Sequence, residues 1–299
     1  MISNVIFGGV YMIELIKFIR NRVEMSQQEF ADELRIAFAT VNRWENGKTT
    51  PPPSAQKAIY QFCLKYNVPV ADFIISFLTE QREKLEKENP NTKIFFHGSK
   101  SGIEGDIAPI SRSQCDFGKG FYMGTEVLQP LTLICNYEKP ILYFASIDKS
   151  DLEVLELPTD ISWAFIVAYN RGKLERAKEK NVYKKYADYV KNRDLIIGDI
   201  ADDRMFYVLD NFFEGNITDK GLVECLSTLQ LGQQYVAVST KACKKIKILK
   251  EYKLSELELM ALKDISEENR QIGIKNANEI CKQYRREGKF FDELLEENK

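Results

Sequence analysis

The chain has 299 residues, enough for about two domains, and its 44% hydrophobic and 29% charged residues are typical of a globular protein. Lys and Arg number 42 against 44 Asp and Glu, so the net charge is -2. A general electrostatic attachment to nucleic acid or to an anionic membrane is therefore not expected. No apolar run approaches the roughly 18 residues of a membrane-spanning helix. We expect a cytoplasmic protein with no membrane partner.

Cysteine and histidine usage narrows the chemistry further. The six cysteines are scattered and no C-x-x-C occurs, so neither a zinc knuckle nor a dithiol redox motif is expected. Without a secretion signal, these cysteines are expected to be free thiols. The chain has one histidine, His97, which excludes a multi-histidine metal site. We predict no bound metal.

The N-terminal part of the chain predicts a compact run of helices. The first eleven residues are apolar but have no basic start, so they are interpreted as a strand or leader arm. Helical spacing of apolar residues then continues over 12–78. Ser26 three residues before Glu29 predicts a capping box, and Pro53 suits the first turn of a later helix. An all-α, five-helix domain over 1–79 is predicted.

Residues 26–48, SQQEFADELRIAFATVNRWENGK, predict two helices joined by a tight turn, with the second suited to a DNA major groove. Asn46-Gly47-Lys48 predicts a left-handed glycine at the end of that helix. The segment resembles the Cro/repressor-type (XRE-like) helix-turn-helix family over about 65 residues. The resemblance implies that double-stranded DNA is a partner. The candidate DNA-binding residues are Gln27, Phe38, Thr40, Asn42, Arg43, Asn46 and Lys48.

Two of these residues are assigned to base reading, but the low net charge of the module supports an alternative function. Arg43 is the best candidate for a guanine, and Asn42 for a base or a phosphate. Residues 12–66 hold eight basic and six acidic side chains, a net charge of only +2, and Arg35 stands at the usual turn glycine. Because DNA affinity depends chiefly on phosphate neutralisation, a helical bundle for protein contacts or dimerisation is the alternative.

The organisation changes after the helical region. Residues 79–93, TEQREKLEKENPNTK, are predicted to be a helical tail that runs into an Asn-Pro linker, and 80–93 is assigned as the segment between the domains. Short strand-like runs then alternate with helical stretches without a strict βαβ period, which predicts an α+β domain over 94–255. The charged tail at 256–299 is predicted to be a helix that packs on the domain or on a second copy of the chain. The strand-like runs are KIFFHG, GKGFYMG, ILYFAS, LEVLEL, LIIGDI, QYVAVST and KKIKIL.

Five segments of this domain occur in an informative order. His97 ends the run FFHGS, and Tyr122 lies in DFGKGFYM, whose two glycines imply close backbone approach or unusual φ. WAFIVAYNR at 163–171, IGDIADD at 197–203 and QQYVAVST at 233–240 follow. The set resembles the ADP-ribosyltransferase superfamily, in the branch with a His–Tyr–Glu triad, and a family of uncharacterised bacterial domains within it. The resemblance spans roughly 94–250 and implies a split-β-sheet fold that takes NAD as its substrate.

The resemblance implies roles for individual residues. His97 would bind a ribose hydroxyl, Gly98 would hold the nicotinamide amide through its backbone, and Ser99 would reach the adenosine side. The ring of Tyr122 would stack on nicotinamide, and a core aromatic is the alternative interpretation of this residue. Further candidate cofactor-binding residues are Arg112, Phe117, Gly118 and Lys119. Solvated basic residues are the alternative for the arginine and the lysine.

The third triad position departs from the family pattern. Gln234 aligns where glutamate normally binds the ribose 2′-hydroxyl, and Gln233 is the second choice; a strand-end surface amide is the alternative interpretation of Gln234. Loss of that charge costs a few kcal/mol of transition-state stabilisation. Asp202 and Asp203 are candidates to replace it, or else a helix N-cap. Leu133 stands where elongating enzymes carry a second stacking aromatic, which favours transfer of a single ADP-ribose.

The sequence therefore predicts a mono-ADP-ribosyltransferase that uses NAD and is fused to a DNA-binding module, as a bacterial toxin, defence or self-regulating enzyme. The catalytic candidates are His97, Tyr122 and Gln234. One alternative is a transcription regulator whose C-terminal domain senses NAD or ADP-ribose without catalysis. A protein-interaction module is another. The acceptor of ADP-ribose, protein or nucleic acid, stays open.

Overall fold

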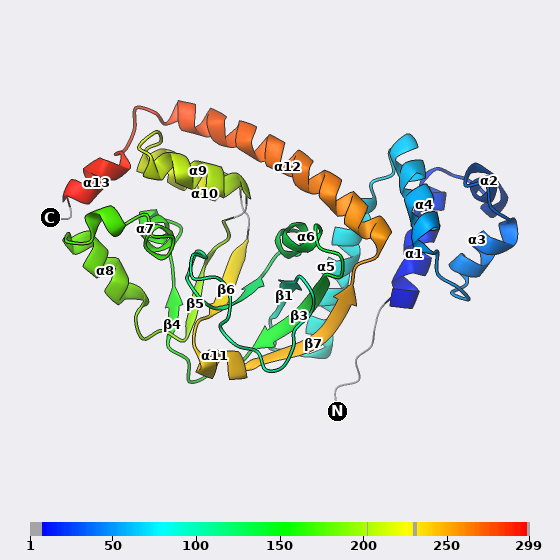
Figure 1. Ribbon diagram of the computed structural model, residues 1–299, viewed down its shortest axis with the longest axis horizontal. Helices are drawn as coiled ribbons and strands as arrows, with labels where there is room; N and C mark the ends of the chain where they lie inside the picture. The colour runs from blue at the N-terminus through cyan, green and yellow to red at the C-terminus, as the bar shows by residue number, and fades with distance from the viewer. Residues whose placement is uncertain (1–7, 202, 230–231, 298–299) are drawn as a thin grey trace. The chain divides into compact units, whose positions relative to one another are not determined.

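The computed structural model describes residues 8–201, 203–229 and 232–297 (Figure 1). The chain divides into two compact units, and each is built from three segments. The first unit comprises Met1–Gly102, Pro130–Ala145 and Ile248–Ser266. The second comprises Ile103–Gln129, Ser146–Lys247 and Glu267–Lys299.

Five helices form the N-terminal part of the first unit, as predicted. Their core consists of fully buried side chains that recur at helical spacing, among them Ile16, Phe30, Val41 and Ile59. The helices are α1 (Gly8–Arg22), α2 (Gln27–Glu33), α3 (Phe38–Glu45), α4 (Pro53–Lys65) and α5 (Val70–Glu88).

Local signals fix the helix ends. The capping box is confirmed: Ser26 accepts a hydrogen bond from the Glu29 N–H, and the Glu29 carboxylate accepts one from the Ser26 N–H. Pro53 occupies the first turn of α4. The prediction of a strand or leader arm at the start is wrong for residues 8–11, because α1 begins at Gly8 and Tyr11 is buried one turn before Leu15. Residues 1–7 lie outside the described part.

The helical tail predicted at the start of the segment 80–93 is confirmed, but it is packed against the first unit. Helix α5 continues to Glu88, because Gln81 is buried and the Arg82 guanidinium lies 5.6 Å from the centre of the Phe96 ring. The side chain of Asn89 then donates a hydrogen bond to the Leu85 carbonyl and ends the helix. Residues 80–88 therefore belong to the first unit and do not form a flexible tether.

Three strands belong to the first unit for most of their length, in the order β1-β3-β7. They are β1 (Ile94–Ser99), β3 (Ile141–Ile147) and β7 (Ile246–Lys253), and α6 (Leu128–Ile134) packs near the end of β1.

Helices α1 and α4 contact the segment Ile248–Ser266 of the same unit through hydrogen bonds and a ring contact. Gln56 accepts a hydrogen bond from the Leu257 N–H, 3.0 Å away, at the start of α12 (Glu256–Gln283). Tyr60 donates a hydrogen bond to the carboxylate of Asp264 on the same helix. The Tyr11 ring packs edge-on against the ring of Tyr252 with centres 5.2 Å apart. The N-terminal helices and the segment Ile248–Ser266 therefore contribute to one folded unit.

The second unit contains four strands in the order β4-β5-β6-β2. The strands are β2 (Phe121–Gly124), β4 (Val154–Glu156), β5 (Leu195–Asp199) and β6 (Gln233–Ala237). Strands β4 and β5 are parallel, whereas β6 is antiparallel to both β5 and β2. The helices are α7 (Ile161–Asn170), α8 (Asn181–Val190), α9 (Asp203–Phe213), α10 (Asp219–Leu229), α11 (Thr240–Lys244) and α13 (Phe291–Glu297), with a 3-10 turn at Glu175–Ala177.

The α+β class and all seven strand-like runs are confirmed, with two corrections. The run QYVAVST ends as a strand at Ala237, because the Ser239 hydroxyl caps α11 by accepting a hydrogen bond from the Ala242 N–H. The tail is interrupted, because Gly288 takes a left-handed φ of 82° and Phe290 pairs with Thr218 between α12 and α13. The split-sheet ADP-ribosyltransferase fold stays a prediction.

Among the described residues, no single helix is long and apolar enough to span a membrane. The pair α4 and α5 meets the length and composition criteria only together, across a bend of 110°.

Candidate functional site

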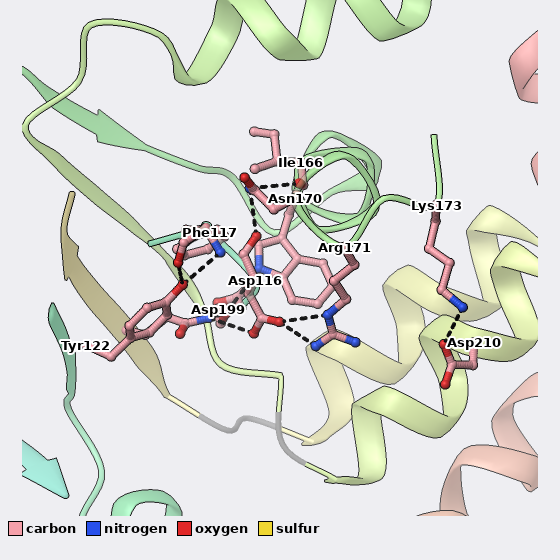
Figure 2. Close-up of polar contacts among 12 residues, drawn as sticks. Asp116, Phe117, Tyr122, Ile166, Asn170, Arg171, Lys173, Asp199 and Asp210 are labelled. Atoms are coloured by element: carbon pink, nitrogen blue, oxygen red, sulfur yellow. Dashed lines mark hydrogen bonds and ion pairs between the residues drawn. The ribbon is translucent and has the colours of Figure 1, made fainter. Parts of the chain in front are cut away.

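The polar centre of the second unit is the carboxylate of Asp116, in the loop before β2 (Figure 2). Its Oδ1 accepts hydrogen bonds from the guanidinium of Arg171, one of them from Nε at 3.1 Å. Its Oδ2 accepts a hydrogen bond from Nε2 of Gln234 at 3.2 Å. The Asp116 backbone carbonyl accepts one from Nδ2 of Asn170 at 2.9 Å. Three of the motif segments therefore meet at one residue.

Helix α7 delivers the arginine to this position. Asp160 caps its N-terminus, and Arg171 is the residue at which it ends. The guanidinium also lies 4.1 Å from the centre of the Phe206 ring, which favours a cation–π contact. The Arg171 and Asp116 side chains are only 15% and 9% exposed. Because the pair is largely removed from water, loss of either partner leaves a poorly solvated charge.

Gln234 is buried, with 6% exposure, so the interpretation as a surface amide is wrong. Its Nε2 donates to Asp116 and also to the backbone carbonyl of Asp199, at 3.0 Å. The indole N–H of Trp163 donates to the same carbonyl at 3.0 Å. Both amide hydrogens of Gln234 are thus committed to the protein. A glutamate here would lose both donors and face the Asp116 carboxylate, which is a physical reason for glutamine at this position.

Tyr122 is held by the glycine loop that precedes it. Its hydroxyl donates to the Gly118 carbonyl at 2.7 Å and accepts from the Phe117 N–H at 3.1 Å (Figure 2). Burial and the nearby Asp116 charge raise the pKa of Tyr122, so the hydroxyl remains a neutral donor. The half-buried ring is therefore fixed in orientation.

Both glycines of this loop meet the conformational demands that the sequence predicts. Gly118 has a φ of 75°, and a Cβ there would lie 3.0 Å from Oδ1 of Asn170. A Cβ at Gly120 would collide with Val236 on the neighbouring strand β6. The loop therefore depends on glycine at both positions.

His97, Gly98 and Ser99 lie at the end of β1, in the first unit. The imidazole of His97 is half-buried, and its centre lies 6.1 Å from the centre of the Tyr143 ring. A Cβ at Gly98 would lie 2.9 Å from both Ile134 and the Pro130 carbonyl, so only glycine fits. The Ser99 hydroxyl closes a turn with the Gly102 backbone. From the order of the motifs, the sequence predicts that His97 shares a cleft with Tyr122 and Gln234, and this stays a prediction.

The remaining candidates differ in exposure. Arg112 and Lys119 are exposed, whereas the Phe117 ring is buried in the core against Gly198. Asp202 lies outside the described residues, and Asp203 is the first residue of α9.

A pocket of about 280 Å³ adjoins the network in the second unit. Asp199 is the acidic residue in its wall, and it pairs with Gln233 across strands β5 and β6. Oδ2 of Asp199 is buried and accepts no hydrogen bond from the described residues. Burial raises the pKa of Asp199, and a hydrogen bond from Thr159 lowers it in part. The lining residues are Thr159, Asp199, Ile200, Leu226, Ser227, Gly232 and Gln233.

Asp199 was not among the sequence candidates. The motif IGDIADD contains this aspartate, but only the later pair, Asp202 and Asp203, is a candidate from the sequence. Within the described ranges, no group of three or more His, Cys, Asp or Glu side chains is arranged to hold a metal ion. The expectation of no metal stays a prediction.

In the helical module, the carboxylate of Glu45 joins three helices. It is 3% exposed and accepts hydrogen bonds from Nε of Arg20 at 2.7 Å and from Nε2 of Gln27 at 2.6 Å. Oε1 of Gln27 in turn accepts a hydrogen bond from Asn42 at 3.2 Å. Gln27 and Asn42, both predicted to contact DNA, are therefore engaged within the protein. A DNA contact by either side chain has to share or replace these bonds.

The other predicted DNA-binding residues are more accessible. Arg43 extends along α3, where its Nε donates to the Ala39 carbonyl, and with half-buried Thr40 it lines a surface groove. Arg35 takes a φ of 56° in the turn, the conformation that glycine usually supplies, and Gly47 a φ of 68° as predicted. Exposed side chains are Phe38, Arg43, Asn46 and Lys48.

Together, the two regions define a helix-turn-helix DNA-binding module followed by an α+β domain with a buried polar network. Residues 16–59 match the family described as Helix-turn-helix. Residues 93–248 match the family described as Protein of unknown function (DUF3990), and the chain belongs to this family. No curated protein and no solved structure matches the chain significantly.

The ion pair at the network centre predicts a large effect on stability. Arg171→Met should lower the free energy of unfolding by about 3–5 kcal/mol, because it leaves a buried carboxylate without its cation. Lys173→Met is the matched control, because its pair with Asp210 is 43% and 52% exposed and contributes about 0–1 kcal/mol (Figure 2). Urea unfolding measures both. Equal losses in the two variants would contradict a buried centre.

Asp199 predicts an unusual pH dependence. Because its pKa is raised in the folded chain, the stability contributed by its protonated form is lost as pH rises from about 4 through that raised pKa. The side chain in Asp199→Asn cannot ionise. As the pH rises from 4 to 7, the free energy of unfolding of this variant should therefore increase relative to that of the wild type. Asp194→Asn should keep a nearly constant difference from the wild type over the same range, because hydrogen bonds lower the pKa of Asp194 and its titration lies below about pH 4. Parallel curves for the two variants would exclude the assignment.

The DNA module predicts two separable effects on binding to the promoter of its own gene. Arg43→Ala should weaken binding by about 1–3 kcal/mol if the side chain reads a base. Lys48→Ala should lower the slope of log affinity against log salt by about one unit, because the family resemblance places Lys48 at a phosphate-contact position. Lys17→Ala, on the exposed part of α1, is the control. Absence of binding at low salt would favour the protein-contact alternative.

Proposed function

We propose that this chain is a DNA-binding protein whose α+β domain, predicted over 94–255, binds NAD and transfers a single ADP-ribose to an acceptor. The observation that supports the proposal is the convergence of the motif segments on one network. Asp116, Asn170, Arg171 and Gln234 are connected by direct hydrogen bonds, and the same loop fixes the Tyr122 ring. Such rigid support is what a site needs to present a ring and backbone groups to a flat ligand.

The reaction proposed breaks the bond between C1′ of ribose and the nicotinamide nitrogen. The electron pair leaves with nicotinamide, while a nucleophile of the acceptor bonds to C1′ and loses its proton. Positive charge develops on the ribose during the step. His97 is assigned to a ribose hydroxyl, and Tyr122 to the face of the nicotinamide ring.

Gln234 is assigned a positioning role, because both of its amide hydrogens are used within the protein. Asp199, on the neighbouring strand β5, pairs with Gln233 in the strand register and belongs to the pocket wall. We assign to Asp199, in place of Asp202 or Asp203, the charge that stabilises the ribose in the transition state. A toxin, defence or self-regulating role would follow from an acceptor near bound DNA.

A second candidate is a regulator that binds NAD or ADP-ribose without turnover. The observation that favours it is again Gln234, since the position that carries glutamate in the enzymes of the superfamily has no charge and no spare donor here. In this case the second domain would report the ligand to the DNA module.

The purified full-length chain distinguishes the two candidates. Incubation with NAD should release nicotinamide, measured by chromatography, and NAD should raise the midpoint of thermal unfolding. His97→Ala should abolish release, whereas Lys184→Ala, an exposed change on α8, should leave it unchanged. A thermal shift without nicotinamide release would support only the second candidate, the regulator that binds without turnover. If neither nicotinamide release nor a thermal shift is observed, both candidates are refuted.

A further inference from the structure

Two cysteines outside the proposed site face each other in the second unit. Cys225 lies on α10 and Cys281 on α12, and their sulfur atoms are 3.8 Å apart. Both are free thiols in the structure. A disulfide requires an S–S distance of about 2.05 Å, so the pair is in contact but not bonded.

Small residues bring the two helices together at this point. The Cys225 sulfur also lies 3.9 Å from the Ala277 carbonyl, one turn before Cys281. On α10, a Cβ added at Gly221, one turn before Cys225, would lie 3.9 Å from Cα of Cys281. Gly221 and Cys225 on one helix thus face Ala277 and Cys281 on the other. The thiols lie in a close helix–helix contact, where their side chains have little freedom to separate.

The two thiols differ in exposure and in pKa, as a pair with one attacking and one resolving cysteine requires. Cys281 is half-buried, and its hydrogen bond with Cys225 lowers the pKa of the Cys281 thiol. Cys225 is buried, and the same bond together with burial raises its pKa. Burial alone raises the pKa of the Cys63, Cys135 and Cys243 thiols. Cys281 is therefore placed to act as the attacking thiolate and Cys225 as the resolving thiol.

We propose that Cys225 and Cys281 are a reversible oxidation site that takes a hydroperoxide. The Cys281 thiolate attacks a peroxide oxygen, the O–O bond breaks, and a sulfenic acid and a hydroxide that becomes water are formed. The Cys225 sulfur then attacks the sulfenic sulfur: the S–S bond forms, the S–O bond breaks and a second water leaves with the Cys225 proton. Two thiols are oxidised by two electrons, and one hydrogen peroxide is reduced to two waters.

The bond would constrain a helix that also serves the DNA module. Helix α12 carries Cys281 near its end, whereas Leu257 and Asp264 near its start bond to Gln56 and Tyr60 of α4. The disulfide would close a loop that contains β6, α11, β7 and most of α12, and so restrict the unfolded chain. Oxidation is expected to raise the thermal midpoint of the full-length chain by several degrees.

The test treats the reduced full-length chain with a small excess of hydrogen peroxide, then alkylates and digests it. The count of alkylated thiols should fall from six to four, with a cross-linked Cys225–Cys281 peptide, and dithiothreitol should restore both. Cys281→Ser should abolish the cross-link, whereas Cys243→Ser, a buried cysteine on α11, should retain it.

Because Cys225 is buried, its substitution could impair folding, so Cys281→Ser is compared with wild type under reducing conditions, where the two thermal midpoints should agree. Stable sulfinic acid on Cys281 without a cross-link, or a cross-link between different chains, would overturn the proposal. Persistence of the Cys225–Cys281 thiols under peroxide that oxidises other cysteines would overturn it equally.

Discussion

The ion pair between Asp116 and Arg171 is the interaction on which the rest of the second unit depends. A buried carboxylate needs hydrogen-bond donors, and Asp116 receives them from Arg171 at the end of α7 and from Gln234 on β6. Asn170 of α7 binds the backbone carbonyl of Asp116. Meeting that requirement fixes the end of α7, orients Gln234 and sets the loop that holds Tyr122. Segments more than a hundred residues apart in the sequence are thereby brought to one place.

The same solution appears in the helical module, where buried Glu45 binds Arg20 and Gln27 and so joins α1, α2 and α3. In both cases a residue type that suggests ligand recognition instead satisfies a buried carboxylate. The module is nearly neutral, so its DNA affinity depends on the few exposed groups, Arg43, Asn46 and Lys48 among them, rather than on a broad basic surface. Its attachment to α12 makes it part of a larger folded unit.

Most elements could be predicted from sequence because their signals are local. Strand patterns, the Ser26 capping box, Pro53 and the two loop glycines depend on neighbours within a few residues. The helix at 80–88 is predicted, but its packing into the first unit could not be, because that depends on Gln81 burial and on the Arg82 guanidinium meeting the Phe96 ring of β1. The same holds for the site: the motifs identify Gln234 and Tyr122, but only the fold reveals that Asp116, Arg171 and Asp199 surround or support them.

A crystal structure of the chain grown with NAD would show whether the Asp116 network supports a nicotinamide site, as we propose. The nicotinamide ring should lie on the face of the Tyr122 ring, with ring centres about 4.5–7 Å apart, and a ribose hydroxyl should lie within hydrogen-bond distance of His97. The Tyr122 hydroxyl should keep its bonds to the glycine loop. NAD bound away from both residues, or absent from crystals at saturating concentration, would contradict the proposed nicotinamide site.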